Sequence, residues 1–174
     1  MNRWLLGTGV VSILAKASGG ALRCGRGVVH VSEAVELESR RGDPNSPQNR
    51  LLDLTDNRGD RVFEVLPVLL DTPEFDLLSE LRPCEETASV DLGEHESIAL
   101  CATSHPKLIF VSLDEGALRL ALSELGRGRV AYPYELCEEL ENIGALEEDE
   151  FERALEGFER HTDGTVPVPA RLKS

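Results

Sequence analysis

The chain has 174 residues, of which 41% are hydrophobic and 29% charged, a composition typical of one folded domain rather than a disordered chain. No apolar run reaches the roughly 18 residues that a membrane-spanning helix needs, so we expect no membrane segment. The four cysteines are widely spaced and form no C-x-x-C pair. This spacing argues against a structural zinc site or a redox motif and favours reduced thiols in a cytoplasmic protein.

The formal net charge of −14 is unevenly distributed. Residues 135–159 hold eleven acidic residues and one arginine, a net charge of −10. Residues 1–61 hold nine Lys or Arg and seven Asp or Glu, a net charge of +2. A uniformly acidic surface would repel nucleic acid, whereas here the N-terminal third can still face a phosphate backbone. The acidic run itself is most simply a solvated helix face.

The segment WLLGTGVVSILAKAS, residues 4–18, has two interpretations. Its positive start, apolar run and small-x-small ending are typical of a secretory signal peptide. It also fits a short strand that turns into a helix from Thr8 to Ala17. We favour the strand and helix, because the rest of the chain continues the same alternation and residue 7 then lies at the carboxyl end of a central strand.

Strand and helix patterns alternate along the remaining sequence. Strands are expected at residues 27–31, 61–68, 107–114 and 129–133. Pro67 makes the second of these an edge strand. Helices are expected at residues 32–41, 72–83, 91–104, 115–126, 134–143 and 147–160, with one short helical turn inside the loop 41–60. The alternation predicts an α/β fold, a three-layer α/β/α sandwich with a central parallel sheet.

Start and stop signals support these helices. Ser32 is a good N-cap, Asp91 is an expected cap, and Gly126 is placed to end its helix. In the helix at residues 115–126, Leu118 and Leu122 are among the residues predicted to face the core. We expect a single domain at residues 1–160 and a polar tail at residues 161–174, flexible or bound to a partner.

Acidic residues at strand and helix ends are the candidates for chemistry, because the sequence has no Walker lysine, no full dinucleotide fingerprint and no GxSxG elbow. These acidic residues are Glu38, Glu94, Glu96 and Asp114. Carboxylates that converge on one cleft repel each other unless a cation lies between them, and hard oxygen ligands suit Mg²⁺ or Mn²⁺. Such a site can activate water against a phosphodiester. Since Glu94 and Glu96 are two positions apart on a helix, they cannot both face one cleft; we favour Glu96, with Glu94 as a supporting or capping residue.

Three stretches of the sequence together resemble a PIN domain, the metal-dependent ribonuclease fold common among prokaryotic toxins. They are VDLGEHESIALCA (residues 90–102), FVSLDEGALRLALSELG (residues 110–126) and RVAYPYELCEELENIGAL (residues 129–146). They are most similar to the branch that carries LDxGExEAIxLA before a strand-helix unit with xxDDxxAxxxA. VHVSEAVELES, residues 29–39, is similar to the family pattern V-x-x-P-E-A-V-x-x-E-L. The resemblance covers roughly residues 4–145.

The resemblance implies a metal-dependent endoribonuclease whose catalytic residues hold Mg²⁺ or Mn²⁺. Glu38, Glu96 and Asp114 match the ligand positions. The expected neighbours of these ligands are Thr8, Glu94 and Glu115. Family members carry an aspartate at the end of the first strand, where this chain has Gly7, and the aspartate pair of the later strand is reduced to Leu113 and Asp114. Gly7 therefore marks a lost-ligand position.

Two hypotheses follow from this departure, and a third, weaker one is a cytosolic α/β domain whose resemblance to the family is coincidental. In the first, the chain is a nuclease of a toxin-antitoxin or nucleic-acid-processing system, with reduced or lost catalysis and weakened ion binding. In the second, it is a catalytically inactive PIN-like subunit that recognises RNA or a protein partner. The acidic C-terminal helices favour a basic protein partner, such as an antitoxin or another subunit of an assembly, and a homo-oligomer is also compatible with the sequence.

Overall fold

The computed structural model describes residues 1–40, 42–82 and 91–161. In these residues the strands form one sheet: β1 (Arg3–Leu6), β2 (Val29–Ser32), β3 (Phe63–Leu66), β4 (Leu108–Val111) and β5 (Val130–Ala131). The strand order is β3-β2-β1-β4-β5, and every neighbouring pair is parallel. The predicted parallel sheet is therefore confirmed. β3, which was predicted at residues 61–68 with Pro67 in that range, lies at an edge of the sheet, as expected.

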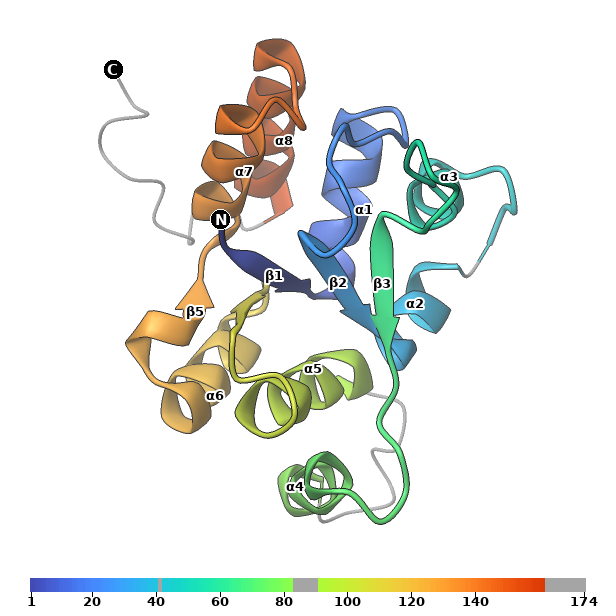
Figure 1. Cartoon of the computed structure of the whole chain (residues 1–174). Coiled ribbons are helices and arrows are strands. Elements are labelled where there is room, and N and C mark those ends of the chain that lie inside the picture. The colour runs from blue at the N-terminus through green and yellow to red at the C-terminus, as the bar shows by residue number, and fades with distance from the viewer. Residues whose placement is uncertain (41, 83–90, 162–174) are drawn as a thin grey trace.

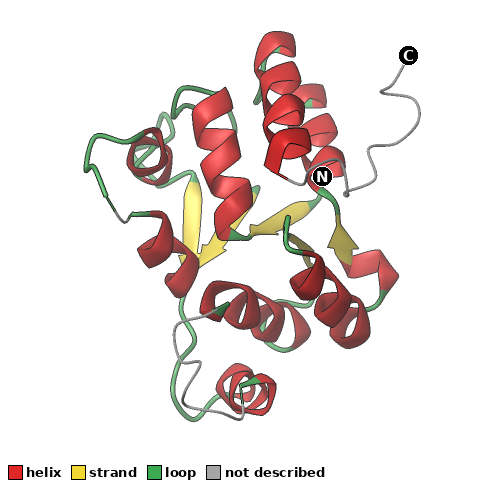
Figure 2. Ribbon diagram, turned by 180° about the vertical axis from the view of Figure 1, so that it is seen from behind, coloured by secondary structure: helices red, strands yellow, loops and turns green. Residues whose placement is uncertain are grey.

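Helices cover both faces of this sheet (Figure 1). They are α1 (Thr8–Ala17), α2 (Glu33–Ser39), α3 (Pro47–Leu52), α4 (Pro73–Leu81), α5 (Leu92–Ala102), α6 (Glu115–Leu125), α7 (Pro133–Asn142) and α8 (Glu148–His161). One face carries α1, α3, α7 and α8, the opposite face carries α5 and α6, and α4 packs on the outer side of α5. The view from behind shows the same layers on either side of the strands (Figure 2). The three-layer α/β/α sandwich predicted from the sequence is confirmed.

The two faces of the sheet bury separate apolar clusters, because successive strand residues point to opposite faces. Trp4 and Leu6 belong to the cluster under α1 and α8, whereas Leu5 belongs to the cluster under α5 and α6. The buried side of α6 is formed by Ala117, Leu118 and Ala121. The prediction that Leu122 faces the core is wrong, since this side chain is 40% exposed.

Local signals account for most helix boundaries. Ser32 Oγ accepts a hydrogen bond from Val35 N and begins α2, as predicted. Asp91 occupies the N-cap position of α5 but its side chain makes no capping hydrogen bond. Gly126 follows α6 with a positive φ of 79°, a conformation that glycine adopts without strain.

The sequence also led to expectations about membrane segments, the cysteines and the C-terminal tail. Within the described residues, no helix has both the length and the apolar character that crossing a membrane requires. Cys101 and Cys137 are buried, as expected, and Cys24, the third described cysteine, is also free. Cys84 lies outside the described residues. The predicted tail, residues 161–174, does so too apart from His161, the last residue of α8.

Candidate functional site at the carboxyl edge of the sheet

A crevice is expected between β1 and β4, because the chain leaves these two neighbouring strands in opposite directions across the sheet. Ligands of open parallel sheets bind outside the carboxyl ends of the strands at such a switch point. Gly7 follows β1 and Ser112 follows β4, and Gly7 N donates a hydrogen bond to Val111 O at 2.9 Å. The ends of β1 and β4, which Gly7 and Asp114 follow, therefore lie at the same edge of the sheet.

Gly7 has neither a backbone conformation nor a packing environment that requires glycine. Its φ of −77° and ψ of 162° are accessible to any residue. A Cβ atom built at this position would lie 3.4 Å from Ser112 Oγ and 3.5 Å from both Glu94 Oε1 and Val111 O. These are ordinary van der Waals separations. Position 7 would therefore accept a Cβ atom, in normal contact with the carboxylate of Glu94.

Glu38 lies at the same edge and is held by the start of α1. Thr8 Oγ1 donates a hydrogen bond to Glu38 Oε2 at 2.6 Å. Since Thr8 directly follows Gly7, this bond places the carboxylate of Glu38 near the end of β1. The resemblance predicted that Thr8 neighbours the ligand set, and the structure places the two side chains in direct contact.

Glu94 is half-buried and close to other carboxylates. Burial raises the pKa of Glu94 above its ordinary value, and the negative charges of Glu38, Asp91 and Asp114 raise it further. The hydrogen bond from its own backbone acts in the opposite direction. No ion pair with Glu38 or Glu94 is present among residues 1–40, 42–82 and 91–161. This edge of the sheet thus concentrates negative charge that no described cation neutralises.

Gly93 allows α5 to approach α2 closely enough to place Glu94 there. A Cβ atom at Gly93 would lie 2.7 Å from Val35 Cγ2 and 3.1 Å from Glu38 Oε2, and the first distance is too short for a real contact. Ser97 Oγ also donates to Gly93 O at 2.7 Å. Gly93 therefore provides the close packing of α5 on α2, and the next residue, Glu94, places its carboxylate beside position 7.

Glu96, the glutamate favoured from the sequence, points to a different partner. Its Oε2 accepts a hydrogen bond from Ala34 N at 2.9 Å, so it caps the first turn of α2. Burial raises its pKa, while the hydrogen bonds from Ala34 and Ser32 oppose the increase. The structure places Glu94, rather than Glu96, beside Gly7. A role for Glu96 as a metal ligand stays a prediction.

Asp114 and Glu115 sit where β4 passes into α6. Asp114 Oδ1 accepts a hydrogen bond from Ala117 N at 2.6 Å and caps α6, and its backbone N donates to Ser112 Oγ. Glu115 is exposed and forms an ion pair with Arg119 on the outer side of the helix. Asp114 is therefore in electrostatic range of Glu94 but already engaged through one oxygen, while Glu115 pairs with a cation on the surface.

Comparisons of the chain with models of protein families, with curated proteins and with solved structures found no match.

The described residues do not form a complete metal site. They contain no group of three or more His, Cys, Asp or Glu side chains placed to hold one ion. Two carboxylates, Glu38 and Glu94, lie near the start of α1 and beside position 7, and oxygen ligands of this kind suit a hard cation. The set present does not fit a tightly held Mg²⁺ or Mn²⁺, so no catalytic step is assigned to such an ion.

Two residues of this cleft were not predicted from the sequence. Ser112 is 2% exposed and its hydroxyl faces position 7. Gly93 is needed for the contact between α5 and α2. A glycine inside a predicted helix is a signal of close packing, whereas a serine after a buried strand gives no distinguishing signal.

Proposed function

We propose that this chain is a PIN-like protein related to metal-dependent endoribonucleases, with an ion site that lacks the ligand at position 7. Its catalysis on RNA phosphodiesters is accordingly reduced or lost. The observation that carries this proposal is that position 7 needs no glycine, since its backbone conformation is ordinary and an added Cβ would be in normal contact with Glu94 Oε1 at 3.5 Å. A carboxylate at that position would join Glu94 and Glu38 at the carboxyl edge of a parallel sheet.

The raised pKa of Glu94 supports the same proposal. Carboxylates that crowd a half-buried cleft without a cation disfavour one another's charged form. Clusters of this kind are more common at functional sites than elsewhere in proteins. A divalent cation would relieve the repulsion, and a site with fewer carboxylates than usual would bind it weakly.

A second candidate function is recognition of a protein partner by a catalytically inactive subunit. Residues 135–159, with their net charge of −10, span most of the neighbouring helices α7 and α8 and the turn between them. This concentration of charge on one side of the molecule favours a basic partner segment, as in an antitoxin or another subunit of an assembly.

Titration with Mn²⁺ tests the first proposal. Calorimetry on the wild-type chain should show weak binding, and RNA cleavage should be slow or absent. Gly7→Asp should tighten Mn²⁺ binding by about tenfold or more, because another carboxylate adds both charge and an oxygen ligand. Gly7→Asn, which offers an oxygen without charge, should give a smaller gain.

Gly128→Asp is the matched control, since a Cβ at Gly128 meets nothing within 4 Å. It adds the same charge away from the cleft and should leave Mn²⁺ affinity unchanged. If Gly7→Asp lowered the melting temperature and left Mn²⁺ affinity at the wild-type value, the lost-ligand proposal would be wrong. If all four proteins bound Mn²⁺ equally, a role of this cleft in ion binding would be wrong as well.

A further inference from the structure

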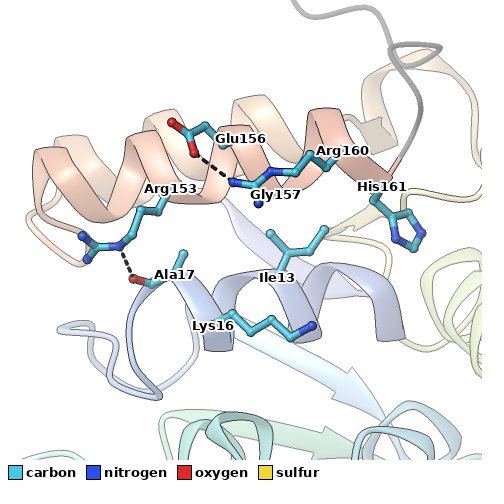
Figure 3. Close-up of a pocket in the computed structure, with 8 residues that line it drawn as sticks. All are labelled: Ile13, Lys16, Ala17, Arg153, Glu156, Gly157, Arg160 and His161. Atoms are coloured by element: carbon cyan, nitrogen blue, oxygen red, sulfur yellow. Dashed lines mark hydrogen bonds and ion pairs between the residues drawn. The ribbon is translucent and has the colours of Figure 1, made fainter.

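A separate pocket lies between α1 and α8, on the face of the sheet opposite α5 and α6 (Figure 3). Its volume is about 450 Å³, within the range of pockets that take small molecules. The buried side chains of Ile13 and Ala17 and the backbone of Gly157 form its apolar part. A Cβ at Gly157 would lie 2.7 Å from Ile13 Cγ2, so the glycine lets the two helices come together here.

Cationic side chains surround this apolar part. Lys16 comes from the last turn of α1, and Arg153, Arg160 and His161 come from α8. Glu156 is the acidic residue among those that line the pocket. In a chain with a net charge of −14, this pocket therefore has an excess of positive charge. Local charge of this sign attracts anions even when the whole protein is acidic.

Two of the cations of the pocket are engaged with neighbouring groups, in contacts that are partly or largely exposed to solvent. Arg153 Nε donates to Ala17 O at 3.1 Å, and its guanidinium also pairs with Asp149. Arg160 pairs with Glu156 at 3.0 Å, and both side chains are largely exposed. Exposed pairs of this kind contribute little to stability, so an anion can replace the carboxylate at low cost. Lys16 makes no interaction with the other residues drawn in Figure 3.

We propose that this pocket binds a phosphate group carried by a small organic molecule of about mononucleotide size. Lys16 and Arg160 contact the phosphate, because several cations together favour a doubly charged oxyanion. The surface formed by Ile13, Ala17 and Gly157 takes the less polar body of the ligand. The phosphate can belong to a free mononucleotide or to the end of an RNA strand, and the experiment separates these sources. The proposal does not depend on ion binding at the cleft beside Gly7.

Calorimetry and amide chemical-shift mapping of the full chain, without divalent metal, test this inference with three probes: AMP, inorganic phosphate and a 5′-phosphorylated RNA pentamer. AMP should bind more tightly than inorganic phosphate, and its shifts should map to the second half of α1 and to α8. The double variant Lys16→Glu/Arg160→Glu should weaken AMP binding by about tenfold or more, because two attractive charges become repulsive. Equal affinity for AMP and the pentamer identifies the mononucleotide unit as sufficient, whereas much tighter pentamer binding identifies the strand end as the source.

The matched control is Lys107→Glu/Arg127→Glu, which makes the same change in net charge at exposed residues outside this pocket. It should lower affinity far less, and melting curves of both double variants should show that the fold is retained. Absence of AMP and pentamer binding up to about 10 mM ligand would overturn the proposal. Equal losses in the two double variants, or shifts that map to Gly7 and Glu94 instead, would overturn it as well.

Discussion

Thr8 and Glu38 join the first turn of α1 to α2 through a hydrogen bond of 2.6 Å from Thr8 Oγ1 to Glu38 Oε2. This contact bridges two helices that follow neighbouring strands, and it fixes the direction of a carboxylate at the candidate site. The bond therefore has both a structural and a positioning role.

Thr8→Val should remove this hydrogen bond while it keeps the shape of the side chain. We expect a loss of about 1–3 kcal/mol in the free energy of unfolding, because the bond involves a charged acceptor in a partly buried setting. Urea unfolding measures the change. Thr8→Ser keeps the hydroxyl and should recover most of the stability; if Ser and Val variants were equally destabilised, the hydrogen bond would not be the cause.

Glu94→Gln should change how stability depends on pH. The folded-state pKa of Glu94 is raised above the ordinary value of 4.5, so the folded protein holds this proton more tightly than the unfolded chain. Its contribution is fully present below pH 4.5 and is lost as the pH rises through the folded-state pKa. Above that range the Gln variant should be the more stable protein, since it never ionises.

Melting temperatures of wild type and Glu94→Gln should be measured across acidic and neutral pH. The difference between the two melting temperatures at each pH tests this prediction. Glu152→Gln, on the exposed surface of α8, is the control and should show no such difference. A difference between wild type and Glu94→Gln that stayed constant over the whole pH range would contradict the prediction.

Gly93→Ala should destabilise the fold by about 1–3 kcal/mol, the usual cost of overpacking. The added Cβ would lie 2.7 Å from Val35 Cγ2, so α5 and α2 would have to move apart. Thermal unfolding measures the cost. Gly128→Ala, where nothing lies within 4 Å of the added Cβ, is the control. Equal melting temperatures for the two variants would show that the close packing of α5 on α2 does not require glycine at position 93.

Leu118→Asp and Leu122→Asp should have very different effects although they lie one turn apart on α6. Leu118 is 5% exposed, and an unpaired charge there should cost several kcal/mol and unfold the domain. Leu122 is 40% exposed, and its substitution should cost about 1 kcal/mol or less. Circular dichroism and melting curves compare them. Similar unfolding of both variants would mean that α6 is rotated relative to the sheet.

The sequence alone determined most of the secondary structure and the class of fold. The bounds of α1, Thr8–Ala17, agree with the prediction, and Ser32 begins α2 as expected. These features depend on signals within a few residues: apolar runs, a capping hydroxyl, or a proline that cannot donate to a sheet. The alternation of strands and helices then leaves a parallel sheet as the simplest way to cover two apolar faces.

The tertiary structure decided which side chains meet. Glu94 and Glu96 are the same residue type and lie two positions apart on one helix, so the sequence alone could not show which of them faces Gly7. The close packing of α5 on α2 at Gly93 turns Glu94 toward the cleft and leaves Glu96 at the N-terminus of α2. In the same way, the pocket between α1 and α8 brings Lys16 and Arg160 together from segments more than a hundred residues apart. Local sequence patterns fix the type of each element, whereas the rotation of a helix about its axis is set by the surface on which it packs.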